Sequence, residues 1–600
     1  MEFTRLNRPI GVEWQAENLE VEGQIRPEIN GAFFRAVPDP AFAPLFPDDS
    51  ILSADGMVSR FSIQNGTVDH AIRYLRTPRF EAEHKARRAL FGRYRNPFTD
   101  LPEVQGVDRA VANTTPVWHG GRLFMTKEDA LAYEVNPHTL ETMGPWTYEG
   151  KLRSMTMTAH PRIDPVTGEM FMFGYEASGL CTDDVAYFIA DKDGNLKSEE
   201  WFKVPYCSLM HDFGLTERWA VFAVFPTKTD LERLKQGGVH WHHEQDGDSW
   251  IGIMPRYGKG SEMRWFKGPK GVFSFHYINA YDEGDIVHLD ICLADSNPFP
   301  FIRAATGDFR PTFDLKMTST RWTFDMSNPA DTFTARDICP PGDLPRVRDA
   351  DLSRPYPHFW MPSMNPQGGP PVPGGPVGAQ FNCLLRIESQ TGRIDMAQFG
   401  PNTAVSEPVH VPSASRGMTA GCWSSWTMRS IRAAMSPNSS CWMRRILPRR
   451  RWRVCGCPCR CTRRSMAAGS PPRNWPSHAD ERRAPPLPEQ GDGGQRRRER
   501  RVELRGYLAR VRPGRHGIRY GCRYLRKGFP APGLRALPDE HDGSGMAHSP
   551  APGSRRSRAD AGGPLGVAAI LALASAADRR RCCRVGRWRR VRCDAGGLAG

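Results

Sequence analysis

The pattern of apolar and polar residues in the first two thirds of the chain predicts many short strands. Short runs rich in Val, Phe, Ile and Tyr alternate with clusters of Gly, Pro, Asn and Asp that favour turns. Residues 169–177, 219–226 and 285–294 show this pattern clearly, whereas 80–92 and 230–238 are the best candidates for helices. So many short strands in one region predict an all-β barrel, sandwich or propeller.

The chain changes character after Pro412. Beyond that residue stand 39 Arg, one Lys and 12 Asp or Glu, a net charge of +28, which leaves −13 of the total +15 for residues 1–412. The basic pI therefore belongs to the tail and gives no reason to expect that the body binds nucleic acid or an acidic membrane. We divide the chain into a folded domain, 1–412, and a low-complexity basic tail, 413–600, whose low apolar content predicts disorder.

Cysteine usage and apolar runs bear on location. Five of the 15 cysteines lie in residues 1–412 without a pairing rhythm, which fits a reducing cytoplasm. The charged N-terminus has no apolar signal segment, and the longest apolar run, Gly563–Ala577, is shorter than the roughly 20 residues that span a bilayer. We expect a cytoplasmic protein without a membrane span, and the sequence leaves a homodimer open.

Three histidines occupy the same place in a repeated unit of histidine, turn and strand. They are His160, His211 and His276, separated by 51 and 65 residues. A propeller blade takes roughly 40–50 residues, and a propeller arranges equivalent strand ends around one axis. The three imidazoles would converge there, and neutral imidazoles without a nearby cysteine suit iron, copper or zinc.

Each histidine also has a simpler interpretation. A lone histidine among apolar residues is more often part of the core than a ligand, although three at equivalent positions favour a metal site. His242 and His243 lie in a polar segment and are interpreted as solvated. His288 falls inside a predicted strand and is interpreted as structural.

Further motifs resemble the carotenoid cleavage oxygenases. Residues 30–35, Asn-Gly-Ala-Phe-Phe-Arg, resemble the opening motif of that family, and residues 55–58, Asp-Gly-Met-Val, resemble its early turn. The resemblance runs from about Leu6 to Pro412. It implies a seven-bladed β-propeller, here incomplete at the C-terminus, with Fe(II) on its axis. It also implies that the three histidines of the repeated unit are iron ligands.

Residues 92–100 and 126–129 resemble the lignostilbene branch of the family. In that branch a tyrosine and a lysine grip a phenolic hydroxyl, which implies these roles for Tyr94 and Lys127. Without the resemblance, a packing aromatic and a surface charge would be the preferred interpretations. A held or deprotonated 4-hydroxyl pushes electron density into a conjugated alkene. The implied reaction is cleavage of a 4-hydroxystilbene by dioxygen into two aromatic aldehydes. A phenylpropenoid such as isoeugenol, or an apocarotenoid, is the alternative substrate.

The resemblance further implies acids behind the iron ligands, because a partner on the second ring nitrogen fixes the tautomer. Glu128 and Glu407, the latter in Ser-Glu-Pro-Val, match two such glutamates. A third acid is expected before a proline in residues 356–365, but Phe359-Trp360-Met361-Pro362 stands there and none is assigned. We find no dinucleotide fingerprint or phosphate loop and expect no organic cofactor.

The fourth histidine of the family is missing from its expected context. The four tail histidines, at 478, 516, 541 and 548, do not stand in a Val-His-Gly motif. The Arg-rich, Lys-poor sequence of the tail is typical of GC-rich DNA translated out of frame. With suitable synonymous codons, residues 423–426 read two bases later give Val-Val-Val, and residues 464–469 give Val-His-Gly-Ser-Trp. We therefore predict that the tail is an out-of-frame translation.

The tail has two other interpretations. The arginines of residues 495–501 could bind nucleic acid through phosphates, and the alternating cysteines 455–461 could bind metal. We expect neither, and no nucleic acid partner. A chain without its fourth ligand and closing strands could instead be an inactive propeller, since open sheet edges are a liability.

Overall fold

The computed structural model describes residues 9–311, 314–369, 381–399, 404–412, 419–424, 451–453 and 589–591. The chain divides into two compact units. The first comprises Met1–Cys461 with Arg581–Gly600, and the second is Thr462–Arg580. All described residues belong to the first unit.

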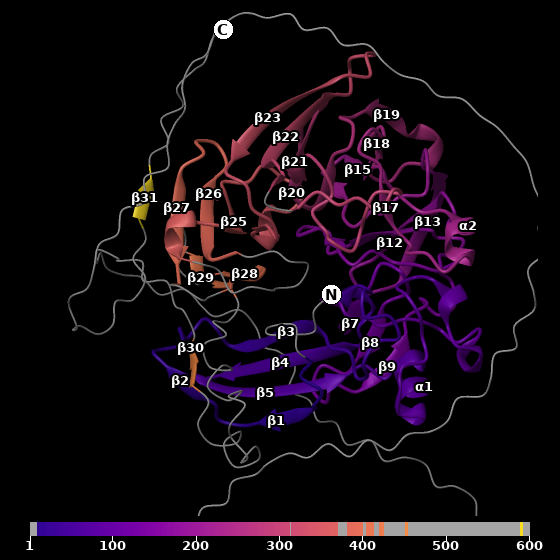
Figure 1. Ribbon diagram of the computed structural model, residues 1–600. Helices are drawn as coiled ribbons and strands as arrows, with labels where there is room; N and C mark the ends of the chain where they lie inside the picture. The colour runs from indigo at the N-terminus through magenta and orange to yellow at the C-terminus, as the bar shows by residue number, and fades with distance from the viewer. Residues whose placement is uncertain are drawn as a thin grey trace, which may run out of the picture. The chain divides into compact units, whose positions relative to one another are not determined.

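Within that unit, the described residues form six antiparallel blades, which follow one another in chain order (Figure 1). Five blades have four strands, and the sixth has a fifth strand, β31 (Arg589–Val591), at its end. Blade 1 pairs in the order β1-β5-β4-β3, and the other blades pair in chain order. The strands of blades 1 and 2 are β1 (Trp14–Ala16), β3 (Gly31–Pro38), β4 (Gly56–Gln64), β5 (Thr67–Tyr74), β6 (Thr115–His119), β7 (Arg122–Thr126), β8 (Tyr133–Val135) and β9 (Thr142–Pro145). Those of blades 3 and 4 are β10 (Arg162–Ile163), β11 (Met170–Tyr175), β12 (Asp184–Ala190), β13 (Leu196–Lys203), β14 (Gly214–Leu215), β15 (Trp219–Val224), β18 (Trp250–Pro255) and β19 (Arg264–Lys267). Those of blades 5 and 6 are β20 (Phe273–Glu283), β21 (Ile286–Ala294), β22 (Met317–Asp325), β23 (Phe333–Cys339), β24 (Arg346–Val347), β25 (His358–Ser363), β26 (Cys383–Glu388) and β27 (Ile394–Gln398).

Burial explains the sequence pattern of these strands. Every residue of β11, Met-Phe-Met-Phe-Gly-Tyr, is buried, because both faces of an inner strand pack against neighbouring blades. β23, the last strand of blade 5, has four exposed residues in succession, two of them charged, as expected of a sheet edge. The three segments that showed the strand pattern most clearly coincide with β11, β15 and β21, so that prediction is confirmed.

The two predicted helices are also confirmed, although both are short. α1 (Pro78–Ala86) begins at Thr77, whose hydroxyl accepts a hydrogen bond from the backbone N–H of Phe80 at 3.2 Å. α2 (Leu231–Lys235) begins at Asp230, whose carboxylate accepts from the N–H of Arg233 at 2.7 Å. In the described part of the chain, neither helix is long and apolar enough to cross a membrane.

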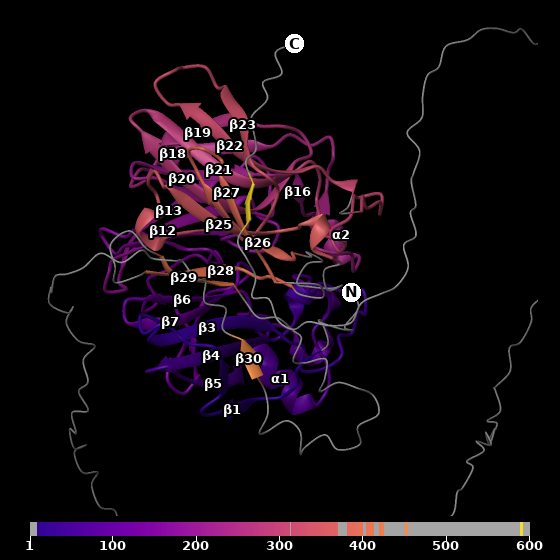
Figure 2. The same cartoon turned by 90° about the vertical axis from the view of Figure 1, so that its left-hand side faces the viewer.

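The prediction of an all-β propeller is confirmed, but seven blades is wrong for the residues that the structure describes. After blade 6 comes a two-stranded sheet of β28 (Pro408–Pro412) and β29 (Thr419–Ser424). Both views place this pair between blade 6 and blade 1 (Figures 1 and 2). A four-stranded blade there would need two more strands from the residues that follow Pro412.

The prediction of disorder for residues 413–600 falls mostly outside the described residues. The three described segments of the tail form strands. β29 pairs with β28, β30 (Arg451–Arg453) pairs in parallel with β2 (Glu20–Glu22), and β31 (Arg589–Val591) pairs with β27. In the segment between β15 and β18, β16 (Thr227–Lys228) and β17 (His242–His243) form a separate two-stranded sheet.

Candidate functional site

The three histidines of the repeated unit come together in the structure. Each lies just before or within the first strand of its blade: His160 precedes β10, His211 precedes β14 and His276 lies within β20. One ring nitrogen from each lies within 4.8 Å of the other two, and the Nε2 atoms of His160 and His211 are 2.7 Å apart. The arrangement is that of a metal site, with imidazole nitrogens from blades 3, 4 and 5.

Two of the three imidazoles have a carboxylate on their second ring nitrogen. Glu128 Oε2 lies 3.1 Å from Nδ1 of His211, and Asp343 Oδ1 lies 2.8 Å from Nδ1 of His276. Each pair fixes the ring so that Nε2 is the nitrogen available to a metal. The ring of Phe275 lies parallel to that of His211 with centroids 3.5 Å apart, which further restricts the imidazole.

The electrostatics of the cluster suit neutral ligands. Burial lowers the pKa of His160, and the two neighbouring imidazoles lower it further. Burial also lowers the pKa of His211, although Glu128 opposes the shift. For His276, burial lowers the pKa but Asp343 outweighs it, so that the pKa is raised. His160 and His211 are therefore neutral at neutral pH, so that one nitrogen of each ring is free of a proton, as metal binding requires.

The acids behind the histidines differ in part from those expected. Glu128 lies where the resemblance implies, with its side chain 1% exposed. Glu407 contacts none of the three histidines by a hydrogen bond in the described residues, and it pairs instead with Arg346 at 3.5 Å near the surface. The acid missing from the sequence interpretation is Asp343, in the loop between β23 and β24. Asp343 stands two residues before Pro345. The sequence analysis expected an acid before a proline in residues 356–365, whereas the structure has one in this earlier segment.

Tyr94 and Lys127 also meet in the structure. Lys127 follows the last residue of β7, and its Nζ donates a hydrogen bond to the hydroxyl of Tyr94 at 3.0 Å. Both side chains are buried, which excludes the interpretation of Lys127 as a surface charge. Because Glu128 is the next residue, one strand end directs a lysine to the tyrosine and a glutamate to His211.

Charges keep this pair protonated at neutral pH. Burial raises the pKa of the Tyr94 hydroxyl, and Lys127 offsets only part of the effect. Burial lowers the pKa of Lys127, but Asp129, at 3.7 Å from its amine, and Glu128, at 4.0 Å, reverse the shift and raise it. Lys127 in turn lowers the pKa of Glu128, against the effect of burial. A tyrosine hydroxyl that accepts from a protonated lysine still has its own proton to donate.

The remaining histidines of the sequence analysis have structural partners. The prediction that His243 is solvated is wrong, because its ring is buried between the Thr227 hydroxyl at 3.0 Å and the carbonyl oxygen of Gly271, also at 3.0 Å. The same prediction fails for His242, which is mostly buried and pairs with Glu244 at 3.4 Å. His288 lies in β21 and contacts the Thr323 hydroxyl at 2.9 Å, as the structural interpretation expects.

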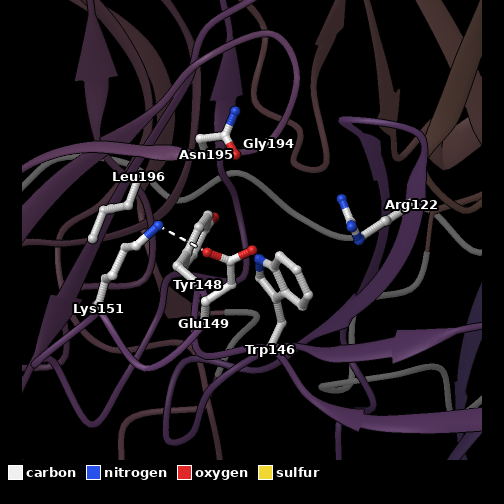
Figure 3. Close-up of a pocket in the computed structure, with 8 residues that line it drawn as sticks. All are labelled: Arg122, Trp146, Tyr148, Glu149, Lys151, Gly194, Asn195 and Leu196. Atoms are coloured by element: carbon white, nitrogen blue, oxygen red, sulfur yellow. Dashed lines mark hydrogen bonds and ion pairs between the residues drawn. The ribbon is translucent and has the colours of Figure 1, made fainter.

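A separate, small polar hollow lies beside β9 and β13 (Figure 3). Arg122, Trp146 and Leu196 line it, and at its edge Glu149 and Lys151 form an ion pair of 2.8 Å. None of its lining residues belongs to the histidine cluster or to the tyrosine–lysine pair. It is therefore distinct from the candidate site.

Comparison with known proteins places most of the chain in one family. Residues 7–432 match the family model described as retinal pigment epithelial membrane protein, RPE65. Lignostilbene-alpha,beta-dioxygenase isozyme III of Sphingomonas paucimobilis is 40% identical over 416 residues, which are 68% of this chain and 85% of that protein. Isoeugenol monooxygenase of Pseudomonas nitroreducens is 37% identical over 414 residues, 67% of this chain and 84% of that protein. The crystal structure of Pseudomonas brassicacearum lignostilbene dioxygenase superposes with a TM-score of 0.68 at 36% identity, covering 70% of this chain and 89% of that one.

Proposed function

The chain belongs to the RPE65/carotenoid oxygenase family, which includes lignostilbene and isoeugenol oxygenases, and from that premise we propose that it cleaves a 4-hydroxystilbene such as lignostilbene into two aromatic aldehydes. The relatives described above are named for oxidation of aromatic alkenes, lignostilbene in one case and isoeugenol in another. The observation that carries the substrate proposal is the buried hydrogen bond between Lys127 and Tyr94. It supports recognition of a phenolic oxygen close to the histidine cluster.

We assign the cluster of His160, His211 and His276 to Fe(II). The donor set fits, because imidazoles without thiolates suit this ion and two of the three are oriented by carboxylates. Iron(II) bound there would supply the centre at which dioxygen reacts with the alkene. Neutral histidines would leave that centre with its full positive charge.

The tyrosine–lysine pair would bind the 4-hydroxyl of the substrate. Lys127 donates to the Tyr94 oxygen, which leaves the Tyr94 O–H free to donate to a substrate oxygen. The positive charge of the lysine stabilises negative charge on that oxygen, in a region from which water is excluded. A substrate oxygen with phenolate character pushes electron density along the conjugated system to the alkene.

The same cluster offers a hydrogen-bond acceptor for the phenolic hydroxyl. One carboxylate oxygen of Asp129 is buried and has no hydrogen-bond partner among the described residues. Its other oxygen lies 3.7 Å from the Lys127 amine. The first of these oxygens is available to accept a hydrogen bond from the hydroxyl of a bound phenol.

A substrate panel tests the proposed specificity. The Fe(II)-loaded chain is assayed with 4-hydroxystilbene, its 4-methoxy analogue, isoeugenol and an apocarotenoid, and the products are identified by mass spectrometry. The proposal expects the highest kcat/KM for 4-hydroxystilbene and a large loss for the methoxy analogue, which cannot become a phenolate. Equal kcat/KM for the hydroxy and methoxy stilbenes would exclude the assigned role of the pair, and preference for isoeugenol would establish the alternative substrate.

One observation favours a second candidate, an inactive propeller. Among the described residues three histidines meet rather than four, and Glu407, expected behind an iron ligand, pairs with Arg346. Iron content discriminates between the two: about one iron per chain after anaerobic loading supports the enzyme, and a value near zero supports the inactive propeller.

We further propose that residues 1–412 are the catalytic domain and that residues 413–600 are an out-of-frame translation. The family match runs 20 residues past this boundary, to residue 432, and leaves residues 433–600 unmatched. Resequencing the coding DNA across codons 405–475 tests this. An extra or missing base near codon 413 would restore a Val-His-Gly motif and a fourth histidine, whereas an intact frame would contradict the proposal.

A further inference from the structure

The turn that carries Tyr94 is held by side chains rather than by regular secondary structure. It lies between α1 and a short 3-10 turn, Pro97–Thr99. The backbone N–H of Tyr94 donates to both carboxylate oxygens of Asp49, each at 3.1 Å. The side-chain amide of Asn96 donates to the carbonyl oxygens of Leu234, at 3.0 Å, and Gly238, at 2.7 Å. The turn is therefore held at Tyr94 itself and again at Asn96, two residues later.

Between these two anchors, Arg95 enters the interior of the propeller. Its guanidinium forms a buried ion pair with Glu176, just after β11, and donates to the Tyr175 hydroxyl at 2.8 Å. The two side chains of the ion pair are 5% and 2% exposed. The ring of His240 bridges the same partners, with one nitrogen 3.1 Å from the carbonyl oxygen of Arg95 and the other 3.2 Å from the Glu176 carboxylate. We call Arg95, Glu176 and His240 the arginine clamp.

Two residues of the clamp have an unfavourable backbone conformation, which their contacts in the fold must stabilise. Arg95 has φ 53° and Glu176 has φ 52°, in the left-handed region that favours glycine. Such a conformation persists only where the surroundings over-determine it, and such residues gather at functional sites. At Arg95 the left-handed turn lets successive side chains diverge, so that Tyr94 reaches Lys127 while Arg95 reaches Glu176.

We infer that the arginine clamp is a positioning device for the phenol site: it holds the Tyr94 hydroxyl at the Lys127 amine and thereby determines the preference for a free 4-hydroxyl. This inference rests on the proposed function of the tyrosine–lysine pair. Lys127 is fixed by the end of β7, whereas Tyr94 belongs to a turn without sheet hydrogen bonds. Productive geometry in such a site must be held within about 0.5 Å. Asp49 and Asn96 hold the backbone of the turn, and the clamp adds a buried ion pair that ties the turn to blade 3 beside them.

The test measures binding, not turnover. The ligands are 4-hydroxybibenzyl and 4-methoxybibenzyl, which lack the alkene and are not cleaved, and the readout is the ratio of their Kd values in the full chain. The test variants are Glu176→Gln, which removes one charge of the clamp, and Arg95→Lys, which keeps charge but loses the planar fork. The matched control is Asp290→Asn, which breaks an equally buried ion pair with Arg321 in blade 5. Thermal unfolding of all variants shows whether Glu176→Gln and Asp290→Asn lower the stability of the fold by similar amounts.

The clamp predicts that Glu176→Gln lowers the preference for the hydroxyl about tenfold, a shift of one decade in the Kd ratio, and that Arg95→Lys lowers it as well. In a Tyr94→Phe background, Glu176→Gln should change the ratio by less than about twofold, because the two act through one hydroxyl. Asp290→Asn should leave the ratio unchanged. Retention of the preference in both clamp variants, or an equal loss in Asp290→Asn, would overturn the inference. If the wild-type chain binds both ligands with equal Kd and Tyr94→Phe leaves the Kd ratio unchanged, the phenol site itself is refuted, and the role of the clamp with it.

Discussion

Metal affinity should depend on Glu128 far more than on Glu407, the other glutamate that the sequence suggests. A hydrogen bond to a charged group contributes about 1.5–3 kcal/mol, more when it is fully buried. Glu128 is 1% exposed and lies 3.1 Å from His211, so we expect the upper value of about 3 kcal/mol, which is about a hundredfold in Kd. Asp343 is 21% exposed, and solvent weakens its interaction with His276 to about 1.5 kcal/mol, about tenfold.

The assay is anaerobic titration of the metal-free chain with Fe(II) in competition with a chromophoric chelator. Glu128→Gln and Asp343→Asn are compared with Glu407→Gln, the matched control, since Glu407 pairs with Arg346. The expected order of loss is Glu128→Gln, then Asp343→Asn, then no change for Glu407→Gln. A loss for Glu407→Gln as large as that for Glu128→Gln, or a larger loss for Asp343→Asn than for Glu128→Gln, would refute the reasoning.

Two further predictions concern the buried charges. Lys127→Met should lower kcat/KM for 4-hydroxystilbene about a hundredfold, because a charge-assisted hydrogen bond is lost. The kcat/KM for the 4-methoxy analogue should stay within about twofold of the wild-type value. Steady-state kinetics in which kcat/KM falls equally for both substrates would contradict this prediction. Burial raises the pKa of Glu176, but Arg95 and His240 outweigh it and lower the pKa from 4.5 to about 2. The ionised carboxylate therefore stabilises the fold above about pH 4.5, and this contribution, about 3 kcal/mol, is lost as the pH falls toward 2. Urea unfolding at pH 5 and pH 3 should show a steeper acid loss for wild type than for Glu176→Gln, and identical slopes would contradict the assignment.

The histidine cluster was accessible from the sequence because a propeller repeats its geometry. His160, His211 and His276 stand at equivalent points of three repeats, so their spacing along the chain maps onto neighbouring positions around one axis. The motifs containing Tyr94 and Lys127 were likewise recognisable by their resemblance to the family, and the structure brings the two side chains into contact at 3.0 Å, while their role toward a phenol stays a prediction.

The supporting residues were not accessible, because their partners are distant in sequence. Asp343 lies 67 residues after His276, in a loop between blades, and no local pattern shows which loop faces the site. Arg95 stands in a polar motif where an arginine is normally solvated, and its burial depends on Glu176, 81 residues later. His243 was misread for the same reason: its polar neighbours indicate a loop, whereas pairing of β17 with β16 buries the ring.

The number of blades was misjudged for a different reason. The sequence resembles a seven-bladed family as far as Pro412, and the resemblance carries the blade count with it. Strands after Pro412 would have to complete the last blade, and within the described residues only β29 joins β28 there.

Single-turnover product analysis under ¹⁸O₂ tests the central claim most directly. The chain, loaded with Fe(II) and with its iron content measured, is mixed with 4-hydroxystilbene beside a His160→Ala variant. We expect the wild-type chain to form two aromatic aldehydes that carry label from dioxygen, and the variant to form none. Unchanged stilbene in a wild-type chain that holds one iron per molecule would contradict it.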